Sequence, residues 1–168
     1  MPDLNVLVVF YSRYGRAEKL ALAAGLGAIQ ANANIRLRRV ADAADAHVIA
    51  SDAAWKQHLD RMNMDYVVPR QADSLWADVI ILGSPAEPCG ELESFLDSLK
   101  STGSLAGKIA APLAVGQSQA ALKPLYAAAG TSGLIVAPAE ISAGDELAGA
   151  RAFGQRVSRM ALALKDAL

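Results

Sequence analysis

The segment SRYGR, residues 12–16, combines a hydroxyl, a phenol, two guanidinium groups and a glycine between an apolar run and a helix-like stretch. A hydroxyl donates hydrogen bonds, and Gly15 permits a backbone conformation in which several N–H groups converge. Helix N-termini attract anions because their first N–H groups are unpaired and the helix dipole is positive there. The segment therefore has the composition of a phosphate-binding loop.

An ordinary turn between a strand and a helix, with Ser12 as the helix cap, explains the same residues. The segment is not the G-x-G-x-x-G dinucleotide pattern, and it lacks the G-x-x-x-x-G-K-[ST] pattern of nucleoside triphosphate loops. Spacing alone therefore leaves phosphate binding and a simple helix cap both open.

Strand and helix patterns alternate around this loop. Continuous apolar runs at 4–10, 78–82 and 108–115 predict strands buried on both faces, although Pro112 is unusual inside one. Arginines alternate with apolar residues at 34–40, which predicts an edge strand with one solvated side, and 134–137 predicts a short last strand. Helices are predicted at 16–31, 51–62, 91–100, 118–129 and 144–168.

This alternation predicts one α/β domain over residues 1–168, with a parallel sheet and right-handed crossovers. Ligands of such sheets lie beyond the carboxyl ends of the strands. Three loops qualify by position, at 11–16, 83–90 and 116–119.

Composition narrows the class of function. The net charge of −1 gives no electrostatic case for nucleic acid or an acidic membrane surface. One cysteine and two histidines, His47 and His58, are too few for a disulfide or a convincing metal cluster, so no metal is expected. No apolar stretch is long enough to span a bilayer, and the first residues lack a basic signal region. A soluble, cytoplasmic protein is predicted, and its alanine-rich helices suggest a homodimer or homotetramer.

Longer segments resemble a known family. VLVVFYSRYGRAEKLA, ADVIILGSPAEPCGELESFLDSL, SLAGKIAAPLAVG, LYAAAGTSGLIVAP and ARAFGQRVSRMALAL resemble successive units of flavodoxin-like proteins, in particular the NAD(P)H:quinone oxidoreductases of the Trp-repressor-binding-protein type. The resemblance covers most of the chain apart from residues 41–73. It implies a three-layer α/β/α sandwich with a five-stranded parallel sheet in the order 2-1-3-4-5.

The resemblance also implies three loops around FMN. The first loop, for the phosphate, is Ser12, Arg13, Tyr14, Gly15, Arg16 and Ala17; the second, against the isoalloxazine ring, is Pro85, Ala86, Glu87 and Pro88; the third, over the polar edge of the ring, is Gly116, Gln117, Ser118 and Gln119. The implied activity passes electrons from NAD(P)H through the flavin to a quinone or similar small-molecule acceptor. No protein group is assigned as a catalytic acid or base.

Two of these loops depart from the family pattern. Ala86, Glu87 and Pro88 stand where the family has threonine, arginine and an aromatic residue. A carboxylate at about 4 Å from an anionic flavin would repel it by roughly 4 kcal/mol at an effective dielectric of about 20. The third loop lacks the repeated glycines of the family pattern.

Two alternative functions therefore stay open. One is a flavodoxin-like binding or regulatory module with weak or lost FMN binding. The other is a one-electron flavodoxin-type carrier, which the near-neutral charge disfavours.

Three further groups have two interpretations each. Cys89 precedes a predicted helix, whose N-terminus would lower a thiol pKa, so it is either redox active or a small apolar filler. Three aromatic residues either line a substrate pocket or belong to the core, namely Trp55, Trp76 and Tyr66. The arginines of the edge strand are expected on its solvated side: Arg36, Arg38 and Arg39.

Overall fold

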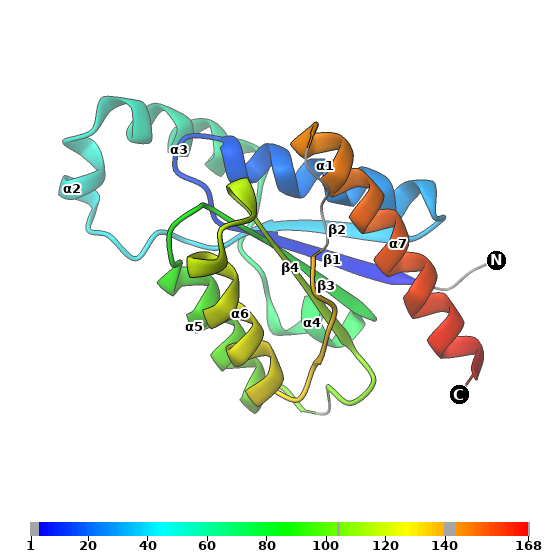
Figure 1. The fold of residues 1–168 in the computed structure, drawn as a ribbon. Coiled ribbons are helices and arrows are strands. Elements are labelled where there is room, and N and C mark those ends of the chain that lie inside the picture. Colours follow the sequence, from blue (N-terminus) through cyan, green and yellow to red (C-terminus); the bar gives the residue numbers. More distant parts are fainter. Residues whose placement is uncertain (1–3, 104, 140–143, 168) are drawn as a thin grey trace.

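The computed structural model describes residues 4–103, 105–139 and 144–167. Parallel strands form one sheet in the order β2-β1-β3-β4-β5, which confirms the predicted fold class and strand order (Figure 1). The strands are β1 (Asn5–Phe10), β2 (Asn34–Arg39), β3 (Val79–Ser84), β4 (Ile109–Ala114) and β5 (Ile135–Val136).

Helices cover both faces of the sheet (Figure 1). α1 (Arg16–Gln30) and α7 (Glu146–Ala167) cover one face, while α5 (Gly90–Ser98) and α6 (Gln119–Thr131) cover the other. The chain between β2 and β3 forms three further helices, of which only the middle one was predicted: α2 (Ala46–Ala50), α3 (Ala53–Asp65) and α4 (Gln71–Trp76). Two short 3-10 turns follow α5 and β4: Leu99–Ser101 and Val115–Gln117.

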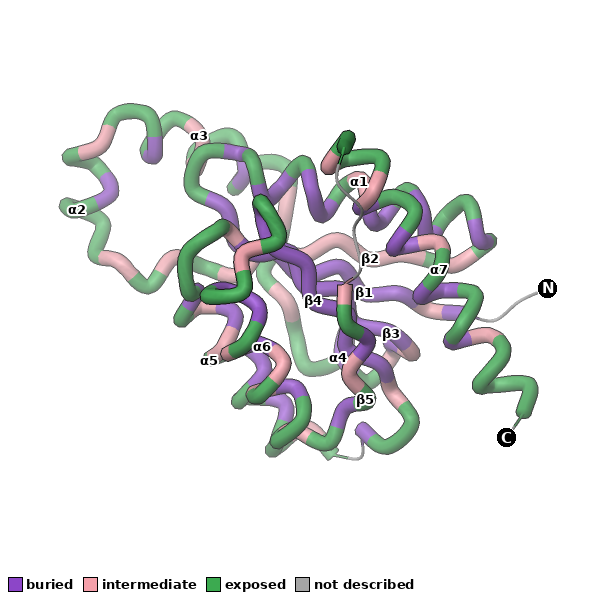
Figure 2. Tube along the Cα trace, viewed as in Figure 1, coloured by how far each residue is buried: buried purple, intermediate pink, exposed green. Residues whose placement is uncertain are grey.

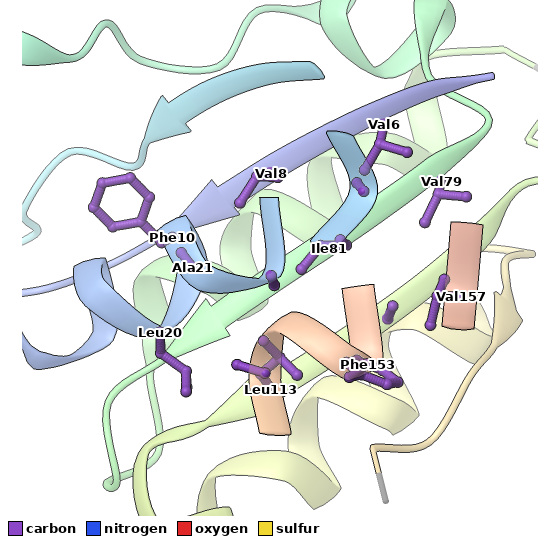
Figure 3. Close-up of a cluster of buried hydrophobic side chains, with 14 of the residues drawn as sticks. Val6, Val8, Phe10, Leu20, Ala21, Val79, Ile81, Leu113, Phe153 and Val157 are labelled. Carbon is purple, nitrogen blue, oxygen red and sulfur yellow. The ribbon is translucent and has the colours of Figure 1, made fainter. Parts of the chain in front are cut away.

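The central strands are buried on both sides, as their continuous apolar runs predict (Figure 2). Successive side chains of a strand point to opposite faces, so Val6, Val8 and Phe10 join the core beneath α1 and α7 (Figure 3). Leu7 and Val9 join the second core, beneath α5 and α6. The sheet therefore separates two hydrophobic cores and holds its strand ends rigidly.

Two glycines let α1 and α7 cross at close range. A Cβ added to Gly27 would lie 1.9 Å from the carbonyl oxygen of Arg151, and one added to Gly154 would lie 2.0 Å from that of Ala24. Both distances are far inside van der Waals contact, so only glycine fits at either position. The two helices therefore meet backbone to backbone.

Pro112 is tolerated in β4 because its missing N–H faces away from β3. Ile109 donates to the β3 side, whereas the carbonyls of Lys108 and Ala110 accept bonds from the β5 side. Hydrogen bonds alternate sides along a parallel strand, so Pro112 shares the direction of Lys108 and Ala110. β5 pairs only with Ile109 and Ala110, so the proline interrupts no bond to β3.

The arginines of β2 differ in exposure: Arg36 and Arg38 are partly solvated, with side chains 36% and 22% exposed, and the prediction of a solvated side is wrong for Arg39. Arg36 and Arg38 form ion pairs with the buried Asp73 of α4, at 3.1 and 2.9 Å. Arg39 is only 4% exposed and pairs with Asp42 at 3.0 Å. α4 and the segment after β2 thus place two carboxylates, Asp73 and Asp42, against the three arginines of this strand.

In the three described ranges, no helix is both long and apolar enough to cross a membrane. The same ranges hold no cluster of three or more histidine, cysteine or acidic side chains placed to bind a metal ion.

Candidate functional site

A cavity of about 230 Å³ opens at the carboxyl edge of the sheet, where the loops after β1 and β3 meet. It brings together nine of the fourteen predicted residues: Ser12, Arg13, Tyr14, Arg16, Ala17, Pro85, Ala86, Glu87 and Pro88. Four more residues complete the lining: Tyr11, Cys89, Glu91 and Val115. The first and second predicted loops therefore share one site.

The first loop is built around a left-handed glycine. Gly15 has φ 99° and ψ −8° and stands at the start of α1. Its N–H donates to the buried Ser12 Oγ at 3.0 Å, and its carbonyl accepts the first helical bond, from Lys19. Helix geometry leaves the N–H groups of Arg16, Ala17 and Glu18 without helical acceptors. Ser12 therefore shapes the loop, and the first turn of α1 supplies unpaired donors for an anion.

Asp42 joins the first loop to the segment after β2. Its carboxylate accepts hydrogen bonds from the hydroxyl of Tyr11 at 2.8 Å and from Nε1 of Trp55 at 3.1 Å, and it pairs with Arg39. Burial would raise the pKa of Asp42, but hydrogen bonds from Arg39, Tyr11 and Trp55 outweigh it and lower that pKa. Asp42 therefore stays ionised at neutral pH. Burial also raises the pKa of Tyr11, which stays protonated.

The N-terminus of α3 braces the same loop from outside. The Tyr14 hydroxyl donates to Asp52 at 2.6 Å, and Asp52 also caps α3 through the N–H of Trp55. The Arg13 guanidinium lies 4.2 Å from the ring centroid of Trp55, and its Nε donates to Tyr11 at 3.1 Å. Trp55 is thus buried support for Arg13 and does not line the cavity.

The second loop supplies a mostly apolar wall with acidic groups at its edge. Glu87 is exposed to solvent, while Glu91 lies half-buried in the first turn of α5. Cys89 is 3% exposed, and burial raises its pKa to about 12, which outweighs the helix N-terminus. The thiol is therefore neutral, and the geometry favours its role as a small packing residue.

The third loop lies outside the cavity lining, which includes only the neighbouring Val115. The structure places Gly116, Gln117 and Ser118 in the turn between β4 and α6, and Gln119 at the first position of α6. The Gly116 N–H donates to Oε1 of Glu146 at 2.7 Å, and Oε2 of that carboxylate lies 3.9 Å from Arg16. Glu146, at the start of α7, therefore links the third loop to the first.

The remaining aromatic residues pack at other places. Trp76 stacks beneath Arg36, with the guanidinium 4.1 Å from the ring centroid. Tyr66 packs edge-on against Phe10 and donates to Glu18 at 2.6 Å. Neither lines the cavity, so both belong to the packing of the domain.

Several residues of the site were not predicted. Tyr11 lies within the loop at 11–16 but was not assigned to FMN, and Glu91 and Val115 adjoin the loops at 83–90 and 116–119, so widening these two loops by one position finds them. Asp42 and Glu146 reach the loops from 31 and 30 residues away in the chain. No local spacing marks such contacts.

No family model matches the chain. Solved structures share its fold over nearly the whole length. A flavodoxin from the domain Archaea superposes with a TM-score of 0.65 at 17% identity, covering 94% of this chain and 99% of that one. An NAD(P)H:quinone oxidoreductase from Methanothermobacter marburgensis gives 0.54 at 13% identity, covering 92% and 99%. These likenesses establish the flavodoxin-like fold.

Sequence relatives are more specific. A protein of Deinococcus radiodurans named NAD(P)H dehydrogenase (quinone) is 30% identical over 146 residues, which are 80% of this chain and 72% of that protein. One of the same name from Geotalea daltonii is 33% identical over 124 residues, but the chain spans only 59% of its length. On this similarity, and with the flavodoxin-like fold, the chain belongs to the NAD(P)H dehydrogenase (quinone) family.

Proposed function

We propose that the protein binds FMN in the cavity between the first two loops and passes electrons from NAD(P)H to a quinone or similar small acceptor. The observation that carries the proposal is the Ser12–Gly15 arrangement at the start of α1, inside a cavity that the second loop closes. The names of the relatives supply the donor and the class of acceptor.

The phosphate of FMN suits the first loop. A phosphate monoester carries about two negative charges at neutral pH and three acceptor oxygens. The first turn of α1 offers unpaired N–H donors, and Arg13 and Arg16 add positive charge at the cavity. The Ser12 hydroxyl accepts from Gly15 through its oxygen and keeps its own hydrogen available as a donor.

An isoalloxazine ring has flat faces that pack against apolar groups, and Pro85, Ala86, Pro88 and Val115 form a wall of that character. Glu87 stands at the exposed rim, where water and salt screen its charge, so its repulsion of the ring is weaker than a buried carboxylate would produce. The cavity therefore fits both parts of FMN.

FMN in this cavity would supply the redox chemistry, namely hydride transfer from NAD(P)H and the passage of two electrons to the acceptor. The chain contributes binding and orientation. The first loop would hold the phosphate and the second loop one side of the ring. Asp42, outside the cavity lining, supports the first loop through Tyr11 and Arg39. Tyr11 and Cys89 stay protonated near neutral pH and therefore add no negative charge.

The experiment is a titration of the purified protein with FMN, followed by flavin fluorescence and the visible spectrum. Saturable quenching in the micromolar range or tighter supports the proposal and leads to an assay of NAD(P)H oxidation by a quinone. Ser12→Ala should weaken FMN binding about tenfold. Ser132→Ala is the matched control, because its hydroxyl donates to the carbonyls of Leu96 and Ala128, outside the cavity lining. A protein that ignores FMN refutes the proposal.

One observation favours a second function, a flavodoxin-like binding or regulatory module with weak FMN affinity. The third loop contributes no residue to the cavity lining, and the carboxylate of Glu146 accepts the hydrogen bond from the Gly116 N–H. A site with two loops holds a flavin less firmly than one with three. The same titration decides between the two functions, because a module with weak FMN affinity shows no saturable quenching in the micromolar range.

We further propose that residues 1–168 act as one cytoplasmic domain that self-associates as a homodimer or homotetramer. Leu22, Leu26 and Ile29 form an apolar stripe on α1 and are each 38–48% exposed. A second subunit would bury this stripe. Sedimentation measurements of the mass in solution test the assembly.

A further inference from the structure

Arg39 holds the anion-binding loop from behind. Its side chain is 4% exposed, and Nη2 donates to the carbonyl oxygen of Ser12 at 2.8 Å. Nη1 donates to the carbonyl of Val40 at 3.2 Å and pairs with Asp42 at 3.0 Å. One guanidinium thus connects the end of β2, the segment after it and the first loop.

The bond to the Ser12 carbonyl restricts the orientation of the loop. The carbonyl of Ser12 and the N–H of Arg13 belong to one planar peptide group and point in opposite directions. Arg39 holds the oxygen, so the N–H of Arg13 points away from Arg39. The side chain of Ser12 is fixed as well, through the N–H of Gly15. Ser12 is therefore held by its backbone and by its hydroxyl.

This anchor carries no uncompensated charge. Asp42 neutralises Arg39 and accepts further bonds from Tyr11 and Trp55. Neither Arg39 nor Asp42 lines the cavity. Their effect on a ligand therefore works through the geometry of the loop, with little direct attraction or contact.

We propose that Arg39, paired with Asp42, is a positioning residue that shapes the first loop for the phosphate group of a flavin mononucleotide. The inference rests on the proposed function, because it assumes that the loop receives this phosphate. It assigns the end of β2 a role in phosphate selection, which the cavity residues alone do not indicate.

The experiment compares FMN with riboflavin, which has the same ring and ribityl chain but no phosphate. Arg39→Lys keeps the positive charge beside Asp42, but a single ammonium cannot reproduce the fork to Ser12, Val40 and Asp42. We expect the FMN affinity to fall by about fivefold or more, with riboflavin affinity unchanged. A residue with only a structural role would weaken both ligands equally.

Arg38→Lys is the matched control on the same strand. Arg38 makes a comparable fork, to both oxygens of Asp73 and to the carbonyl of Leu37, but does not touch the loop. Its variant should lose similar stability and keep the ratio of FMN to riboflavin affinity. Thermal unfolding of both variants checks that they are folded.

The outcomes separate the two proposals. If the unmodified protein binds neither flavin, the proposed function itself fails. If it binds FMN but Arg39→Lys leaves the FMN-to-riboflavin ratio unchanged, or Arg38→Lys alters it equally, the role of Arg39 is refuted. If Arg39→Lys does not fold, Asp42→Asn decides, because it weakens the ion pair that orients Arg39 and lies outside the cavity lining. That variant should show the same selective loss of FMN, and an unchanged ratio would refute the inference.

Discussion

Replacing Gly15 by alanine isolates the cost of one backbone conformation. Gly15 has a φ of 99°, and an added Cβ would meet nothing nearer than 3.8 Å, at Glu18 and His58. Packing therefore contributes little. The cost is that of a left-handed conformation in a residue with a Cβ, about 1–2 kcal/mol.

This cost divides between two measurements. If the loop of the Gly15→Ala variant keeps its shape, the free energy of unfolding falls. If the loop relaxes, Ser12 Oγ loses its partner and FMN binds more weakly. The folded, FMN-bound variant contains the strained residue in either case, so the two losses should add to about 1–2 kcal/mol. Urea denaturation measures the loss of unfolding free energy, and FMN titration measures the loss of binding free energy. If the whole cost appears in binding, the FMN affinity falls about 5–30-fold.

Gly133→Ala is the control for this variant. Gly133 has a φ of 87° and nothing within 4 Å of an added Cβ, and it follows α6 at the opposite edge of the sheet. Its whole cost should appear in stability, with FMN affinity unchanged. The reasoning is refuted if the summed loss at Gly15 is near zero, or if Gly133→Ala weakens FMN binding as much.

Three other expectations concern packing, the arginine over the aromatic ring, and the thiol. Gly154→Ala would place a Cβ 2.0 Å from the carbonyl of Ala24, so the unfolding free energy in urea should fall by about 1–3 kcal/mol; a gain would contradict the close helix crossing. A Trp76→Phe variant keeps Trp55 as the single tryptophan. FMN should change the fluorescence of Trp55, because Arg13 lines the cavity and lies 4.2 Å from the Trp55 ring. Unchanged tryptophan fluorescence at saturating FMN would contradict contact between Arg13 and the ligand. Cys89 is neutral below its raised pKa of about 12, so iodoacetamide should label it slowly at pH 8 until the protein unfolds, and fast labelling of the folded protein would contradict its burial.

The layout of the sheet was predictable because its signals are local. A strand buried on both faces needs an apolar residue at every position, and the runs ending at Phe10 and Leu82 meet that requirement. The first loop was predictable for the same reason, since a strand, a turn and a helix start adjoin one another there. The five-residue α2 and six-residue α4 were missed because so short a helix has little periodicity to read.

The charged residues were not predictable in this way. Alternating arginines in β2 have the pattern of a solvated strand, and they are paired only because Asp73 and Asp42 fold back over them. The third loop likewise depends on a distant partner, since Glu146 takes the Gly116 N–H. Contacts of this kind depend on how the helices are placed, which no local pattern contains.

The glycine crossing of α1 and α7 has a consequence for the tolerance of insertions and deletions. Arg16 and Glu146 each lie eight residues before the crossing, at Ala24 and Gly154. At 1.5 Å per residue, each helix reaches about 12 Å from the crossing to its end at the site. The spacing of these two ends is thus set by the helices and not by the chain that leads into α7. Evolution can lengthen or shorten that connection while Glu146 keeps its place beside Arg16.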